Sequence, residues 1–140
     1  MDFQSCLDKQ NHIQKKFSLF KTQEEKYRFI MEIGRNSPPM PQEEQKEENR
    51  VPGCQSLLYL SVQCIEGKLK ILTHSDALIS AGLAHLLTQV YEGEAPEAVI
   101  HCPPLFLKEI GLLNILSPTR ANGLKSLYQT FQKKALQWIG

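Results

Sequence analysis

Cys54 is the residue of this sequence whose type and position most clearly suggest chemistry. It follows Pro52 and Gly53 in the stretch NRVPGCQS. A proline and a glycine there predict a turn and leave little bulk beside the sulfur, so that a thiol of another protein could approach. The thiolate is the reactive form of cysteine, and Arg50 is a nearby cation that would favour it. A free cysteine is equally often a small buried hydrophobe, so both interpretations of Cys54 stay open on these residues alone.

The other thiols and the histidines lack the spacing of a metal site. The cysteines are Cys6, Cys54, Cys64 and Cys102, with no C-x-x-C pair among them. This spread argues against a zinc knuckle and against a dense disulfide framework, and in a reducing compartment it predicts free thiols. A cysteine hydrolase with His74 or His101 as its base remains an alternative, but neither histidine lies in a supporting motif.

Arg120 is a second residue that needs an explanation. It falls just inside the N-terminus of the last predicted helix, where the helix dipole disfavours a cation by ~0.3–1 kcal/mol. One explanation is an ion pair with a carboxylate such as Asp76 or Glu48. The other is a functional arginine that steadies an anionic sulfur species or grips a partner surface.

The composition predicts one domain over residues 1–140. The chain has 41% hydrophobic residues and a formal charge of +1, so it lacks the basic excess typical of nucleic-acid or anionic-lipid binding. Its longest apolar-rich run, LISAGLAHLL, is far shorter than the ~20 residues that span a bilayer. No secretory signal pattern starts the chain. We therefore expect no membrane partner, no nucleic-acid partner and a cytoplasmic location.

Hydrophobic periodicity and turn signals predict an α+β protein with a small antiparallel sheet flanked by helices. Residues 3–20 have helical spacing, and a second helix follows the capping box of Thr22 and Glu25 and can end at Gly34. Prolines then prevent continuation, and residues 42–49 form an acidic stretch that we interpret as a solvated linker or short exposed turn. Residues 55–65 and 69–74 read as two strands around an EGK turn. Because two strands alone are marginal, a third strand or a helical cover must complete the sheet.

The C-terminal half predicts three more helices. One starts near Ser75 or Asp76 as its cap and runs to Gly93, and a short one lies within residues 103–111. The last has Ser117 as its cap and Pro118 in its first turn. Its predicted core-facing residues are Leu124, Leu127, Phe131 and Trp138.

These stretches, taken together, resemble the SufE family of sulfur-acceptor proteins. The most specific is ENRVPGCQS at residues 48–56, and the others are YRFIMEIGR and PPMP before it, SDALISAGL at residues 75–83 and LSPTRANGL at residues 116–124. They occur in the order and spacing of the family and cover nearly the whole chain. Leu58 and Tyr59 stand where the family commonly has Val-Trp, and KTQEEKY lacks a tryptophan often found there.

The resemblance implies a SufE/NifU-like fold and an accessory role rather than an enzyme activity. Cys54 would take sulfane sulfur from the persulfide of a SufS-like cysteine desulfurase, stimulate that enzyme and pass the sulfur to a SufBCD-like iron–sulfur scaffold complex. No cofactor is implied, and the chain would be a monomer or a homodimer. The resemblance also implies that the acceptor sulfur lies in an apolar cavity when the protein is alone and swings out to meet the desulfurase. The matching motif positions with contact or loop-shaping roles are Gly53, Gln55, Ser56, Asp76 and Arg120.

A second function class stays open, namely a scaffold that assembles an iron–sulfur cluster. Such a protein needs about three converging thiolates, with a carboxylate or histidine as a further ligand. Cys64 and Cys102 would have to converge with Cys54, which their spacing in the sequence does not indicate.

Overall fold

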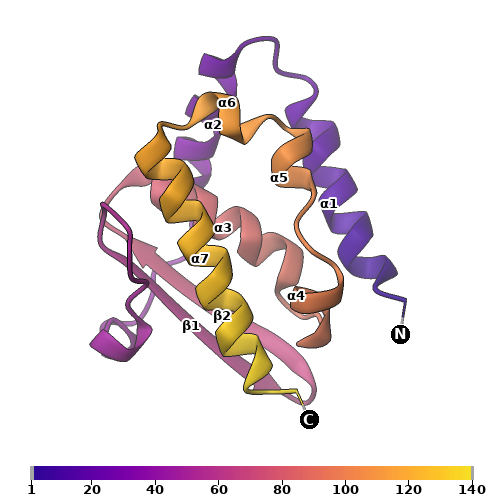
Figure 1. Ribbon diagram of the computed structural model, residues 1–140, viewed down its shortest axis with the longest axis vertical. Helices are drawn as coiled ribbons and strands as arrows, with labels where there is room; N and C mark the ends of the chain where they lie inside the picture. Colours follow the sequence, from indigo (N-terminus) through magenta and orange to yellow (C-terminus); the bar gives the residue numbers. More distant parts are fainter. Residues whose placement is uncertain (1, 140) are drawn as a thin grey trace.

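The computed structural model describes residues 2–139, and these residues form the expected α+β arrangement (Figure 1). Helices lie on both sides of the hairpin in the sequence, and the fold class is confirmed. The elements, in order, are α1 (Gln4–Phe17), α2 (Gln23–Arg35), the 3-10 turns η1 (Gln42–Glu44) and η2 (Glu47–Asn49), strands β1 (Leu58–Ile65) and β2 (Lys68–Ser75), and helices α3 (Leu78–Tyr91), α4 (Glu97–His101), α5 (Phe106–Glu109), α6 (Leu112–Ile115) and α7 (Pro118–Leu136).

The sheet is a single antiparallel hairpin of β1 and β2. Its turn is Glu66-Gly67, and both residues have positive φ, as a type I′ hairpin turn requires. Leu58, Leu60 and Val62 alternate along β1 and are buried. Helices α3 and α7 pack against the strands and against each other, which confirms the helical cover that the short sheet needed. Figure 1 shows α7 lying across the hairpin.

Helices α2 and α3 cross so closely that two glycines are required at the contact. A Cβ atom on Gly34 would lie 2.1 Å from the carbonyl oxygen of Leu78, and one on Gly82 would lie 1.9 Å from that of Ile30. The prediction that Gly34 ends the second helix is therefore wrong, because α2 continues to Arg35 and Gly34 serves the helix contact. The predicted Thr22 cap is confirmed, since its side chain accepts a hydrogen bond from the amide of Glu25.

The start of α3 also differs from the prediction. Its N-cap is Ala77, without a side-chain cap, so neither Ser75 nor Asp76 caps the helix. Both side chains bind the loop before β1 instead: the Ser75 hydroxyl donates to the Leu57 carbonyl at 2.7 Å, and the Asp76 carboxylate accepts from the Leu57 amide at 3.1 Å. The two residues therefore fix the end of the segment that carries Cys54.

Helix α7 starts as predicted and ends earlier than expected. Ser117 accepts a hydrogen bond from the Arg120 amide at 3.2 Å, and Pro118 is the first helical residue. Three of its predicted core residues, Leu124, Leu127 and Phe131, are buried. Trp138 is not, because α7 ends at Leu136; its side chain is 44% exposed, and its indole donates to the Val62 carbonyl at 3.2 Å.

The remaining connections are more structured than the sequence suggested. Residues 42–49 contain the turns η1 and η2, and Asn49 is buried with its amide donating to the Glu44 carbonyl at 2.7 Å. The predicted short helix at residues 103–111 is α5, and it is accompanied by α4 and α6. No helix within residues 2–139 combines the length and the apolar character needed to cross a bilayer.

Candidate functional site

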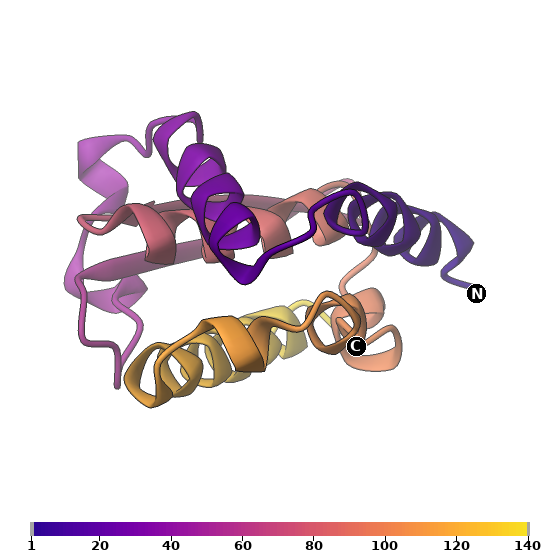
Figure 2. The ribbon, with the colours of Figure 1, turned by 90° about the horizontal axis from the view of Figure 1, so that it is seen from above.

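Cys54 lies in the loop between η2 and β1, which reaches the N-terminal half of α7 (Figure 2). Gly53 has a φ of 73°, the left-handed region that glycine adopts without strain. The thiol of Cys54 is partly buried, and its Sγ donates to the Gly123 carbonyl of α7 at 3.7 Å. The Ser126 hydroxyl, one turn further along α7, donates to the Pro52 carbonyl. The loop is therefore held against α7 on both sides of Gly53.

A small cavity of about 20 Å³ lies beside this thiol. Leu83 and Leu127 supply apolar wall, while Gln55 and Thr119, both exposed, mark the side that meets solvent. A volume of ~10–15 Å³ on this measure holds one water molecule, so the cavity has room for about one atom of that size next to the sulfur. It can accommodate a small addition to Cys54 but not a bulky substrate.

Arg120 projects from the first turn of α7 into the same cavity. Its Nη1 donates to the Ser56 hydroxyl and, at 2.8 Å, to the Ser80 hydroxyl of α3. The predicted ion pair with Asp76 or Glu48 is wrong, since the ion pairs found within residues 2–139 do not include Arg120. The Asp76 carboxylate instead accepts a hydrogen bond from the Leu57 amide, and the guanidinium of Arg120 donates to the hydroxyls of Ser56 and Ser80.

The electrostatics of the cavity act on Cys54 in opposite directions. Burial raises the pKa of the thiol, because a charged thiolate loses solvation there. The positive charge of Arg120 opposes that rise but does not overcome it. The cation that acts on this thiol is thus Arg120 and not Arg50, which lies in a backbone bridge with Tyr59. In this conformation the thiol is predominantly protonated at neutral pH.

The structure brings most of the predicted site residues together. Cys54, Gln55 and Arg120 line the cavity, Ser56 contacts Arg120, and Gly53 precedes the thiol. Asp76 does not reach the cavity and holds the end of the loop. Three further residues contact the loop or Arg120 and were not predicted as site residues: Ser80, Gly123 and Ser126. Ser80 and Gly123 lie within the stretches SDALISAGL and LSPTRANGL, but Ser126 lies outside them.

The remaining thiols lie away from this cavity. Cys6 and Cys102 are buried together, and the Gln10 amide donates to both sulfurs, at 3.9 and 3.4 Å. Burial is the main cause that raises the pKa of Cys6 to about 12, and the neighbouring Cys102 thiol adds to it. The Cys6 thiol is therefore protonated at neutral pH. Cys64 lies near the far end of β1, paired with Leu69. Within residues 2–139 no group of three or more His, Cys, Asp and Glu side chains could hold a metal ion.

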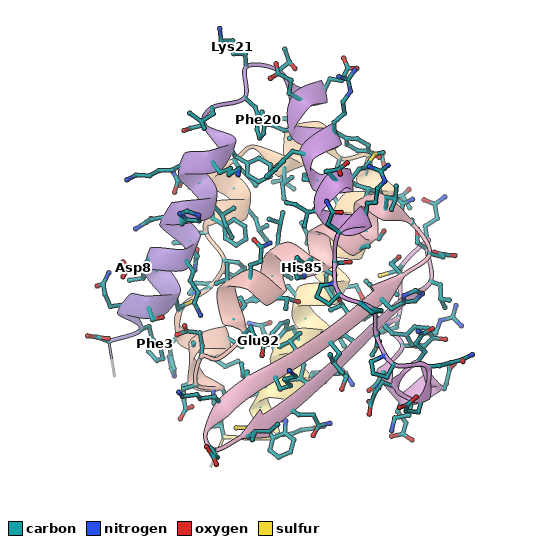
Figure 3. The ribbon with its side chains drawn as sticks, turned by 180° about the vertical axis from the view of Figure 1, so that it is seen from behind. Phe3, Asp8, Phe20, Lys21, His85 and Glu92 are labelled. Atoms are coloured by element: carbon teal, nitrogen blue, oxygen red, sulfur yellow. The ribbon has the colours of Figure 1, made fainter. Side chains whose placement is uncertain are left out.

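His74 and His101, the two histidines considered as bases, lie outside the lining of the Cys54 cavity. His74 pairs with Tyr59 in the hairpin, and the His101 ring stacks on Phe3 with centroids 5.9 Å apart. His85 lies on α3 (Figure 3), and burial lowers the pKa of its imidazole. Within residues 2–139 no histidine, His12 included, lines the Cys54 cavity, so none of them is placed to activate this thiol.

The protein is thus a small α+β domain with one partly buried thiol on a loop beside an arginine. Residues 11–135 match the SufE family, described as an Fe-S metabolism associated domain. The chain belongs to the SufE family, and the protein therefore has a role in iron–sulfur metabolism.

Several relatives cover most of the chain. An uncharacterized SufE-like protein of Synechocystis is 32% identical over 79% of this chain and 70% of its own length. The cysteine desulfuration protein SufE of Wigglesworthia glossinidia brevipalpis is 32% identical over 86% of this chain and 85% of its own length. The solution structure of a hypothetical protein from Thermus thermophilus superposes with a TM-score of 0.77 at 27% identity, covering 92% of this chain and 94% of that one.

Proposed function

We propose that Cys54 accepts sulfane sulfur from the persulfide of a SufS-like cysteine desulfurase, that the protein stimulates this enzyme, and that it passes the sulfur to a SufBCD-like assembly complex in the cytoplasm. The observation that supports this most directly is the placement of Cys54. Its sulfur lies on a loop that follows Pro52 and Gly53, next to a cavity of about 20 Å³ and beside Arg120. The name of the relative from Wigglesworthia, a cysteine desulfuration protein, agrees with this role.

The transfer itself is a thiol–disulfide type exchange. The Cys54 thiolate attacks the terminal sulfur of the donor persulfide and forms a new S–S bond. The S–S bond of the donor breaks, and its electron pair leaves with the donor cysteine as a thiolate, which the proton lost by Cys54 can neutralise. No oxidant or reductant is consumed, and the protein acts as an accessory acceptor rather than an enzyme.

The neighbouring residues would position the loop and its charge. Arg120 faces the sulfur and would favour its anionic form, while its bond to Ser56 holds the loop in place. Asp76 fixes the amide of Leu57 at the end of the loop. Gly53 permits the backbone turn, and Gln55, exposed at the cavity, would contact the partner.

The alternative of an iron–sulfur scaffold receives no support from the described part of the chain. The other three thiols do not line the Cys54 cavity, and Cys6 and Cys102 are buried as a separate pair. A hydrolase is also unsupported, since none of the histidines within residues 2–139 lines that cavity.

Intact-protein mass spectrometry after incubation with a SufS-like desulfurase and free cysteine tests the proposal. We expect one added sulfur atom that peptide mapping places on Cys54. Cys54→Ser should accept none and should not stimulate the desulfurase, whereas Cys64→Ser, a matched change of another partly buried thiol, should behave as wild type. Normal stimulation by Cys54→Ser, or sulfur spread over all the cysteines, would refute the proposal.

A further inference from the structure

The surface next to the Cys54 site carries an apolar groove that the proposed chemistry does not use. It lies between α5, α6 and α7 and has a volume of about 270 Å³. We call it the leucine groove, and it is lined chiefly by Leu105, Leu112, Leu113, Leu124 and Tyr128. Leu105 and Leu113 are 63% and 69% exposed, an unusual exposure for large apolar side chains that lie close together.

The groove is continuous with the site around Cys54. Leu124 lines both the groove and the cavity beside the thiol, and its neighbour Gly123 accepts the hydrogen bond of that thiol. Both features lie along the first turns of α7, with Thr119 at the cavity and Ala121 at the groove. They are therefore separated by no more than the width of one helix, ~10–12 Å with side chains.

A protein that reaches Cys54 must cover this part of α7. A stable protein–protein contact buries ~800 Å² on each partner, which corresponds to a disc of radius ~16 Å. A contact of that size centred on Cys54 extends across α7 and onto the leucine groove. Apolar pockets near the centre of an interface are also where a partner's anchoring side chains contribute most of the binding energy.

The charges around the groove indicate what kind of side chains it would receive. Lys108 and Lys125 are exposed and lie in its lining. Neither takes part in an ion pair found within residues 2–139. A partner segment with acidic residues on either side of an apolar anchoring side chain would fit both the apolar lining of the groove and its two lysines.

We infer that the leucine groove is the docking site for an apolar side chain of the sulfur-donor desulfurase, flanked there by acidic residues. This inference rests on the proposed function, because the donor has to approach Cys54. The groove provides affinity, and the loop with Cys54 provides the chemistry, so the two contributions are separable by mutation.

The test compares Leu105→Glu and Leu113→Glu with Leu19→Glu, a matched control at a 76% exposed leucine outside the lining of the groove. Calorimetric titration measures binding to a SufS-like desulfurase, and sulfur transfer is followed at increasing acceptor concentration. We expect the two groove variants to bind at least tenfold more weakly and to need correspondingly more acceptor for half-maximal transfer. Transfer at saturation and alkylation of Cys54 without partner should stay unchanged, and Leu19→Glu should match wild type. Lys125→Ala should weaken binding and reduce its salt dependence.

Each contrary outcome has a distinct meaning. Groove variants that bind and transfer like wild type would overturn the docking site while the proposed function stands. Wild-type protein that neither binds the desulfurase nor accepts sulfur would overturn both. Self-association of wild type that the groove variants abolish, with desulfurase binding intact, would show that the occupant is a second copy of this chain.

Discussion

Removal of the Ser126 hydroxyl should expose Cys54 more often. This hydroxyl donates to the Pro52 carbonyl and is one of the few bonds that hold the Cys54 loop against α7. A hydrogen bond contributes ~0.5–1.5 kcal/mol net, and because this one is near the surface we take the lower half, ~0.5–1 kcal/mol. At 1.36 kcal/mol for each factor of ten, Ser126→Ala should raise the population of the open loop about two- to fivefold.

Alkylation of Cys54 by iodoacetamide measures that population directly. When the loop opens and closes faster than it reacts, the observed rate scales with the open fraction, so the rate should rise by the same factor. Peptide mapping separates Cys54 from the other thiols. The matched control is Ser18→Ala, which removes a hydroxyl bonded to the Lys15 carbonyl at the end of α1, far along the chain from the loop.

The reasoning fails if Ser126→Ala and wild type are alkylated at the same rate. It also fails if the rate rises only in proportion to a loss of global stability, which thermal unfolding of the same variants reveals. A faster rate for Ser126→Ala with an unchanged melting temperature, and no change for Ser18→Ala, would establish that the bond restrains the loop specifically.

Three further outcomes follow from the site and the helix contact. Arg120→Ala should lower sulfur transfer while leaving Cys54 available to alkylation, because the cation beside the sulfur is lost; full transfer in the mass-spectrometric assay would reduce Arg120 to a structural role. Because burial raises the pKa of Cys54, its alkylation rate should reach half its maximum at a higher pH than that of free cysteine, and a lower midpoint would contradict the closed cavity. Gly82→Ala should destabilise the fold by ~1–3 kcal/mol in denaturant unfolding, since its Cβ would lie 1.9 Å from the Ile30 carbonyl; an unchanged midpoint would show that α2 and α3 can separate at little cost.

Features with a local physical cause could be predicted from the sequence. The caps at Thr22 and Ser117 depend on a hydroxyl and an amide three residues apart, and both are present. The hairpin turn needs positive φ, which Gly67 adopts without strain and Glu66 also adopts. The turn before Cys54 follows from Pro52 and Gly53 in the same way, but β1 starts at Leu58 and not at residue 55, so the loop is longer than predicted.

Features that depend on contacts between distant parts of the chain could not be predicted from the sequence. Asp76 resembles a helix cap in the sequence, but its carboxylate binds Leu57, 19 residues earlier, because the hairpin brings the two together. Gly34 resembles a helix end, but the crossing of α2 and α3 requires it in contact with Leu78. Trp138 continues the apolar stripe of α7 in the sequence, but the helix stops before it.

The hydrogen-bond partners of Arg120 could not be predicted from the sequence, and they affect the charge beside Cys54. A carboxylate partner was the natural expectation for an arginine in the first turn of a helix, yet its partners are the hydroxyls of Ser56 and Ser80. Hydroxyls accept hydrogen bonds without cancelling the charge, whereas a carboxylate would neutralise the arginine and repel a thiolate. The neutral partners therefore leave the positive charge able to act on the sulfur of Cys54. Since Ser56 belongs to the same loop as Cys54, a movement of the loop toward a partner would break its bond to Arg120. Arg120 would thus link the position of the loop to the charge of its sulfur.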